Sequence, residues 1–281
     1  MINAARGVPQ IQELYRRVGR PNAVVERGRF CEFVFDNEAD LIAFKAEAAG
    51  LGISDFLVRK EHIYTRRELL DSPLLQFLVR TSEKGYGVPY YGTKYDLSQA
   101  CPRCGSGARQ TSPLVLKRSD TPSRGDIFQT MDYEYLVSPA LAQGLREARL
   151  SGLELRQAVA HTDNRPLPWY QIVSSRELPP MSGLTRGILR ERPCPLCGRD
   201  GHFQSAFNPI EIAYDRGAVN VDELPDVIHT CECFGNGNLL EPFEESHIAR
   251  PLLIVKPTVF QVFENHKVRR VEFVPVKVVD R

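Results

Sequence analysis

The chain has 281 residues, with 36 lysines and arginines against 35 aspartates and glutamates, which gives a net charge of +1. Its composition, 42% hydrophobic and 25% charged, is that of an ordinary globular protein and excludes the disordered, collagen-like and coiled-coil classes. The balanced charge argues against a protein whose whole surface is basic for binding nucleic acid. The length predicts two domains, or one large domain with an appendage.

No targeting or membrane segment is expected. Arg6, Pro9 and Glu13 interrupt any apolar run near the N-terminus that could serve as the core of a signal peptide. The longest apolar stretches, such as residues 251–255, are far shorter than the roughly 18 residues that cross a bilayer. We therefore expect a cytoplasmic protein with no membrane partner.

Residues 1–95 are predicted to form a small N-terminal α/β unit. Apolar spacing, β-branched content and capping residues define its elements. In chain order these are a helix over 9–18, a strand hairpin over 23–35 that turns at 27–29, a helix over 38–49 capped by Asn37, and strands over 55–64 and 74–80. Residues 81–99, rich in glycine, proline and tyrosine, predict a linker.

Residues 96–281 are expected to form a larger α+β domain that contains a repeated strand–helix–strand unit. When residues 136–160 are laid over 254–278 without gaps, the apolar positions agree although few residues are identical. In each copy a proline, Pro139 or Pro257, begins a helix of about ten residues. Duplication and the convergence of two unrelated units both stay open, and the predicted fold class is α+β.

The strongest motif is a pair of C-P-x-C-G segments, at residues 101–105 and 194–198. Zinc takes four thiolates in a tetrahedron with bonds of about 2.3 Å, and two intervening residues let one turn aim both sulfurs at one point. Proline after the first cysteine starts the turn, and glycine after the second tolerates a positive φ. We predict a structural Zn²⁺ in a zinc ribbon inserted in the larger domain, with the ligands Cys101, Cys104, Cys194 and Cys197.

Four cysteines fill every coordination position of zinc, so the metal is expected to stabilise the protein rather than to catalyse a reaction. The alternatives are a redox C-x-x-C, two separate half-sites, and a site in which His202 replaces one sulfur. His229, Cys231 and Cys233 alternate on a predicted strand, where same-face residues stand about 6.5 Å apart. For these three we favour a buried strand over a second metal site.

Catalytic motifs are missing from the sequence. It contains no H-E-x-x-H, no glycine-rich phosphate loop and no G-x-S-x-G elbow. His161 with Asp163 is the best acid–base candidate, and an ordinary loop contact is the favoured interpretation of that pair. The sequence therefore predicts a protein that is not an enzyme.

Charge is unevenly distributed along the chain. Residues 101–118 and 186–200 carry net charges of +4 and +2, whereas residues 210–249 carry −8. Opposed charged surfaces speed and select encounters with charged partners. The candidate partner-binding residues of the acidic segment are Asp222, Glu223, Asp226, Glu241, Glu244 and Glu245.

With both C-P-x-C-G segments and the P-x-L-x-x-x-L-x-x-x-x-L-x-G-L-E-L pattern that begins at Pro139, the chain resembles the double-CXXCG motif family of bacterial proteins over about residues 95–281. Some members of that family are immunity proteins against toxins delivered between neighbouring cells. The VEFVPV sequence at 271–276 is similar to the ends of other predicted immunity families. The resemblance implies a protein that binds and neutralises a cognate protein toxin, with the four cysteines as zinc ligands. The alternative is a zinc-ribbon protein that binds nucleic acid through its basic residues.

Overall fold

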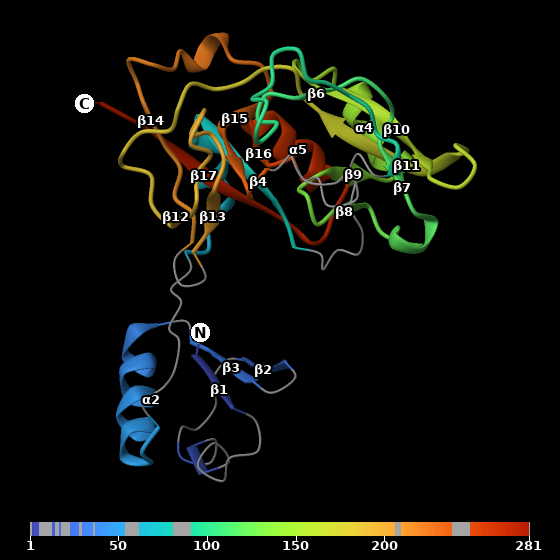
Figure 1. Cartoon of the computed structure of the whole chain (residues 1–281). Helices are drawn as coiled ribbons and strands as arrows, with labels where there is room; N and C mark the ends of the chain where they lie inside the picture. The colour runs from blue at the N-terminus through green and yellow to red at the C-terminus, as the bar shows by residue number, and fades with distance from the viewer. Residues whose placement is uncertain are drawn as a thin grey trace. The chain divides into compact units, whose positions relative to one another are not determined.

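The computed structural model describes residues 2–5, 13–14, 17, 23–27, 30–35, 37–53, 62–80, 91–205, 209–237 and 248–280 (Figure 1). Helices and strands together make a mixed α+β protein, as predicted. The chain divides into two compact units, residues 1–63 with 205–209, and residues 64–204 with 210–281. Within the described residues, no helix has both the length and the apolar character needed to cross a membrane.

Among its fully described elements, the first unit combines a three-stranded antiparallel sheet with the helix α2. Its elements are β1 (Ile2–Ala5), β2 (Ala23–Arg27), β3 (Phe30–Val34) and α2 (Glu38–Gly50), with β3 in the middle of the sheet. Asn37 caps α2 by accepting a hydrogen bond from the backbone N–H of Asp40 at 2.9 Å. Leu41, Phe44 and Ala48 are buried against Phe33, as the apolar stripe predicted. The helix expected over 9–18 and the strand expected over 55–64 fall mostly outside the described residues.

The second unit holds three α-helices among its described residues, α3 (Arg66–Asp71), α4 (Pro139–Glu147) and α5 (Pro257–Asn265). Its first strands are β4 (Leu74–Val79), β5 (Tyr95–Asp96), β6 (Arg109–Gln110), β7 (Val115–Leu116), β8 (Ile127–Gln129), β9 (Tyr135–Val137), β10 (Glu154–Ala160) and β11 (Pro166–Val173). The later strands are β12 (Ile188–Arg190), β13 (His202–Gln204), β14 (Ala213–Asp215), β15 (Val227–Phe234), β16 (Arg250–Val255) and β17 (Val271–Val279).

The two units divide earlier than the boundary at residue 95 that we expected. We placed the strand at 74–80 in the N-terminal unit, but β4 pairs with β16 and β17 of the second unit. The boundary accordingly lies between residues 63 and 64. Six of the residues before β4 form α3, whose N-terminus carries a capping box between Thr65 and Glu68.

Two five-stranded sheets dominate the second unit, and they have the same strand order. One runs β7-β10-β11-β9-β8 and the other β14-β17-β4-β16-β15. In both sheets the pair at one edge is parallel, β7 with β10 and β14 with β17, while the remaining pairs are antiparallel. The two predicted strand–helix–strand segments, β9-α4-β10 and β16-α5-β17, therefore occupy the same places in the two sheets.

The correspondence extends to the register of the middle strands. Gln171 of β11 lies opposite Leu136 of β9 and Arg156 of β10. In the other sheet Gln76 of β4 lies opposite the residues that stand 118 positions later in the chain, Ile254 and Val274. The residues on both sides of Gln171 and the residues on both sides of Gln76 are therefore related by the same offset of 118 that aligns the two sequence segments.

The turns that follow the two helices match as well. After α4, Arg149 and Gly152 have φ angles of 50° and 74°. After α5, Lys267 and Arg270 occupy the corresponding positions with φ angles of 53° and 65°. Because a positive φ is uncommon outside glycine, matched pairs in both turns favour duplication over chance convergence.

The chain order shows that the two copies exchange a strand. The first copy runs from β4 to β10 and the second from β11 to β17. Yet β4 lies between β16 and β17, and β11 lies between β9 and β10. Each copy thus supplies the middle strand of the other copy's sheet.

The exchanged sheets and the two helices share one core. It combines buried residues of both copies, including Leu75, Phe77, Tyr135, Val137, Leu141, Leu145, Leu253, Val255, Val259 and Phe263. Two smaller cores flank it, one around Leu136 and Trp169 and the other around Ile254 and Tyr214. Trp169 is thus a core residue, the interpretation that its place on a strand favours.

Candidate metal centre

Each C-P-x-C-G segment lies between two short strands that pair with each other. The first joins β5 to β6 and the second joins β12 to β13. The chain reverses in both because the N–H groups of Gly105 and Gly198 donate to the carbonyl oxygens of Cys101 and Cys194, at 2.9 and 2.8 Å. Both glycines have a positive φ, 74° and 66°, as their place after the second cysteine predicted.

The two turns bring four sulfur atoms together. The Sγ atoms of Cys101 and Cys194 are 3.7 Å apart, and those of Cys104 and Cys197 are 3.4 Å apart. All four lie within 4.8 Å of one another. Bonds of about 2.3 Å in a tetrahedron separate sulfurs by about 3.8 Å, so the four cysteines could hold one metal ion. Among the described residues they form the sole group of three or more potential ligands with such spacing.

Burial and hydrogen bonding act differently on the four thiols. Cys104 and Cys194 are buried, whereas Cys197 is exposed. Burial raises the pKa of the Cys104 and Cys197 thiols above the usual value. Burial opposes ionisation of Cys101 too, but backbone N–H groups of Cys104 and Arg103 stabilise its thiolate and lower its pKa to about 7. Because a metal ion binds the thiolate form, these backbone donors favour ligation by the sulfur of Cys101.

Asp200 holds the second turn against the segment that follows β15. Its carboxylate accepts hydrogen bonds from the backbone N–H groups of Cys194 at 2.6 Å and Gly237 at 3.1 Å. A Cβ atom at Gly237 would lie 1.9 Å from the carbonyl oxygen of Cys104, so this backbone also lies directly against the first turn. The side chain of Asn236 donates to two carbonyl groups ahead of the second turn. Residues 236–237 therefore contact both turns and hold them together.

The other candidate ligands lie outside the sulfur cluster. The Nδ1 atom of His202 is 3.3 Å from the carbonyl oxygen of Cys233, so His202 does not replace a sulfur. His229, Cys231 and Cys233 lie on β15, whose pairing with β16 shifts between His229 and Cys233. They do not form a possible metal site among the described residues, and Cys233 is 2% exposed. The structure places all three on a strand, where Cys233 is buried and His229 and Cys231 are half-buried.

The predicted acidic partner-binding residues divide into three groups. Asp222 and Glu223 are exposed on the 3-10 helix η3 (Val221–Glu223). The carboxylate of Asp226 instead accepts hydrogen bonds from the hydroxyls of Ser151 and Thr258, both at 2.6 Å. Asp226 therefore joins the first copy to the second, and its expected role in partner binding stays a prediction. The rest lie outside the described residues, namely Glu241, Glu244 and Glu245.

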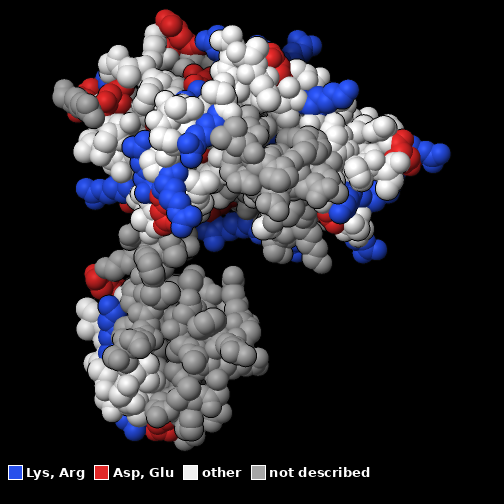
Figure 2. Space-filling view, viewed as in Figure 1, with Lys and Arg blue, Asp and Glu red and all other residues white. Residues whose placement is uncertain are grey.

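Basic and apolar side chains gather around the second cysteine turn. Lys and Arg side chains lie over the β12 and β13 region of the second unit (Figure 2). We call this region the β12–β13 surface, and its exposed residues include Leu184, Arg186, Leu189, Arg190, Arg192 and Leu196, together with one acidic residue, Glu191. Leu196, between the two cysteines of the turn, is 66% exposed. The surface thus combines positive charge with unburied leucine side chains.

His161 and Asp163 are each engaged with other residues. The carboxylate of Asp163 forms ion pairs with Arg118 at 3.4 Å and Arg165 at 3.6 Å. The Nδ1 atom of His161 lies 2.9 Å from the carbonyl oxygen of Tyr91. These contacts agree with the loop interpretation favoured from the sequence.

Sequence reasoning missed Asp200, although it lies two residues after the second C-P-x-C-G segment. The corresponding position of the first segment is Gly107, and this difference between two otherwise similar turns was the available signal. Its second partner, Gly237, could not be identified without the fold.

The chain matches no known family model, and a search of curated proteins finds no similar sequence. The function of the protein is therefore inferred from the geometry of the chain itself.

Proposed function

We propose that this is a zinc-stabilised, non-catalytic bacterial protein of the immunity type, which binds and neutralises a cognate protein toxin. The observation that carries the proposal is the cluster of four sulfurs, which two distant turns bring within 4.8 Å of one another. A tetrahedral ion held by four thiolates has no open position for a water molecule or a substrate. Its binding free energy then contributes to folding instead of to chemistry.

Zinc is the ion that this ligand set supports best. Tetrahedral sites of four thiolates select zinc or iron among the common protein metals. The pair of short hairpins, each with two of the expected ligands in its turn, supports the proposal of a zinc ribbon. Elemental analysis of the purified protein tests the identity of the ion, with one zinc per chain expected. A stoichiometric amount of iron, or no metal, would contradict the assignment.

The β12–β13 surface supports a role in protein binding. Exposed leucines between arginines fit a partner that offers apolar side chains surrounded by acidic ones. Three of these residues are strongly exposed, Leu184 at 54%, Leu189 at 45% and Leu196 at 66%. The turn that carries Leu196 is held by Asp200 and the metal, so little side-chain and loop ordering is required on binding.

Binding is tested with the product of the adjacent gene as the candidate toxin. We expect the two purified proteins to form a stable complex by calorimetry, and expression of this chain to restore growth of cells that express the toxin. Leu196→Asp should weaken the complex at least tenfold, whereas Met131→Asp, at another exposed apolar position, should not. A metal-loaded protein that neither binds the candidate toxin nor protects the cells would contradict the proposal.

The second candidate function is nucleic-acid binding. Arg186, Arg190 and Arg192 are exposed and could contact phosphates. In that case log affinity for DNA or RNA falls linearly with log salt concentration. Arg192→Ala would then weaken binding, and Leu196→Asp would act mainly through its added negative charge. No retention of DNA or RNA at low salt excludes this function.

A further inference from the structure

A cavity of about 440 Å³ lies in the second unit between the two exchanged copies. Its lining has an excess of positive charge. The charged residues that line it are Arg109, Arg156, Arg176, Arg199 and Arg250, against Glu134 and Glu177. Its volume is within the range of about 300–1,000 Å³ that is typical of small-molecule sites.

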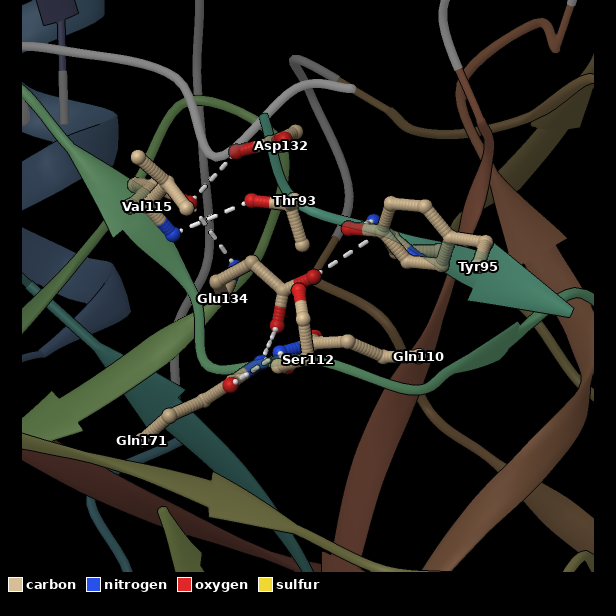
Figure 3. A network of polar contacts seen from close by, with 10 residues as sticks. Thr93, Tyr95, Gln110, Ser112, Val115, Asp132, Glu134 and Gln171 are labelled. Atoms are coloured by element: carbon tan, nitrogen blue, oxygen red, sulfur yellow. Dashed lines mark hydrogen bonds and ion pairs between the residues drawn. The ribbon is translucent and has the colours of Figure 1, made fainter. Parts of the chain in front are cut away.

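One wall of the cavity is a network of buried polar side chains (Figure 3). Glu134 is 8% exposed and accepts a hydrogen bond from the side-chain amide of Gln171 at 2.5 Å. Gln171 is also hydrogen-bonded to Gln110 at 2.9 Å. The other carboxylate oxygen of Glu134 lies 3.0 Å from the Nε atom of Arg250, which donates through its terminal nitrogen to the hydroxyl of Tyr95. Side chains of both copies thus meet at this wall.

The second copy shows that the fold does not require these charges. The residues that correspond to Glu134 and Arg156 are Leu252 and Val274, both buried. Leu252 belongs to the flanking core around Ile254. Burying charged groups costs desolvation free energy, and apolar replacements of similar volume are often neutral or stabilising. Stability alone therefore does not explain the polar wall, and buried charges in a cavity are a feature of ligand sites.

The charged side chains that line the cavity leave it with a net positive charge. Arginine stays protonated in proteins, so all five arginines keep their charge. They outnumber the two glutamates of the lining, which gives an environment suited to an anion.

Arg156 is held in place before any ligand binds. Its Nε and terminal nitrogen donate to the carboxylate of Glu154 at 2.6 and 2.8 Å. Its other terminal nitrogen donates to the carbonyl oxygen of Gln110 at 2.8 Å. A guanidinium group fixed at the wall of a cavity loses little side-chain entropy when it binds.

We propose that this cavity binds a small organic anion, whose carboxylate or phosphate group is held by the arginine side chains. Guanidinium groups form charge-assisted hydrogen bonds with both kinds of oxyanion. The lining borders the two cysteine turns at Gly105 and Arg199 but includes none of the four cysteines. It also includes none of the exposed residues named for the β12–β13 surface, so the proposed anion binding does not depend on the proposed toxin binding.

The test measures binding of citrate, AMP and inorganic phosphate to the full-length, metal-loaded protein at constant ionic strength. We expect at least one of them to bind in calorimetry and to raise Tm at millimolar concentration. Citrate alone would identify a carboxylate site, and AMP or phosphate alone a phosphate site. Arg156→Val, which reproduces the residue of the second copy, should lower the affinity at least tenfold. Arg124→Val, at an exposed position outside the cavity, should leave the affinity unchanged.

Citrate and phosphate also stabilise proteins generally because they are excluded from the protein surface. That general effect would raise Tm equally in the wild type and in Arg156→Val, and such a result would overturn the proposal. Absence of binding by all three anions would overturn it too. If Arg156→Val does not fold, Arg156→Lys provides a second variant. Lysine keeps the positive charge but lacks the planar guanidinium group that can donate two parallel hydrogen bonds to an oxyanion, so binding should still weaken severalfold.

Discussion

Replacing Asp200 with alanine should lower the stability of the protein and its metal affinity together. The carboxylate is 2% exposed and accepts hydrogen bonds from the N–H groups of Cys194 and Gly237. Alanine leaves the buried N–H of Cys194 and the half-buried N–H of Gly237 without that acceptor, at about 1–3 kcal/mol for the first and less for the second. In a chain of this size such a loss corresponds to a fall in Tm of about 10 °C.

The metal affinity should fall because Asp200 fixes the backbone of one ligand. Residues that orient metal ligands typically contribute about 10–100-fold to affinity. Differential scanning calorimetry measures Tm, and competition with a chromophoric chelator measures the zinc affinity. Asp222→Ala is the matched control because Asp222 is exposed, and a change within about 0.5 kcal/mol is expected there. Asp200→Asn retains one acceptor oxygen and should give an intermediate loss.

A Tm for Asp200→Ala within 2 °C of the wild type, with unchanged zinc affinity, would refute this reasoning. It would mean that the N–H groups of Cys194 and Gly237 do not depend on the carboxylate, and that the two turns are positioned by the metal alone.

Three further changes test the metal, a histidine of β15 and the duplication. Cys194→Ser, or removal of the metal by a chelator, should lower Tm sharply, because metal-binding free energy contributes to folding. Burial lowers the pKa of His229 to about 4, so below about pH 6.5 the unfolded chain binds a proton at this histidine before the folded protein does. The free energy of unfolding should therefore be highest above about pH 6.5 and should fall by about 3 kcal/mol as the pH decreases toward 4. His229→Gln, which reproduces Gln129 of the first copy, should flatten urea-measured stability over that pH window. Gly152→Ala should destabilise by at least about 1 kcal/mol, because φ is +74° and the new Cβ would meet a backbone oxygen at 2.4 Å.

The cysteine and glycine changes each have a control within the chain. Cys231→Ser alters a thiol outside the sulfur cluster and should leave zinc content unchanged. Arg270→Gly relieves a positive φ of 65° at the position equivalent to Gly152 and should stabilise the protein slightly. Equal loss of zinc in the two cysteine variants would contradict the four-sulfur site. An unchanged pH profile in His229→Gln would show that another group titrates.

The features found from sequence depend on residues close together in the chain. Helix α2 followed from its cap at Asn37 and its stripe of Leu41, Phe44 and Ala48, all within four turns. The cysteine cluster followed from two local turns whose ligand chemistry allows few alternatives. Helix α3 was missed because it is only six residues long, although Thr65 and Glu68 have the spacing of a capping box.

The placement of β4 could not be found from local pattern. Leu74–Val79 is an apolar run interrupted only by Gln76, a pattern that is typical of any buried strand and does not specify a partner. Its neighbours, β16 and β17, lie near the other end of the chain. The polar wall at Glu134 was missed for the same reason, since Arg250 and Tyr95 reach it from distant segments.

The exchange of β4 and β11 means that neither half of the second unit is self-sufficient. Tyr170 pairs with Val137, which lies close to it in the chain, but Leu75 pairs with Val255 near the other end, so that ladder closes only after almost the whole second unit has been formed. Contacts this far apart in sequence make folding slow and strongly cooperative. Cleavage of the chain in the turn between β10 and β11 would leave two fragments that still share their strands and stay associated. Either fragment expressed alone would lack the middle strand of its sheet, and a second copy of the same fragment could supply that strand by forming a dimer.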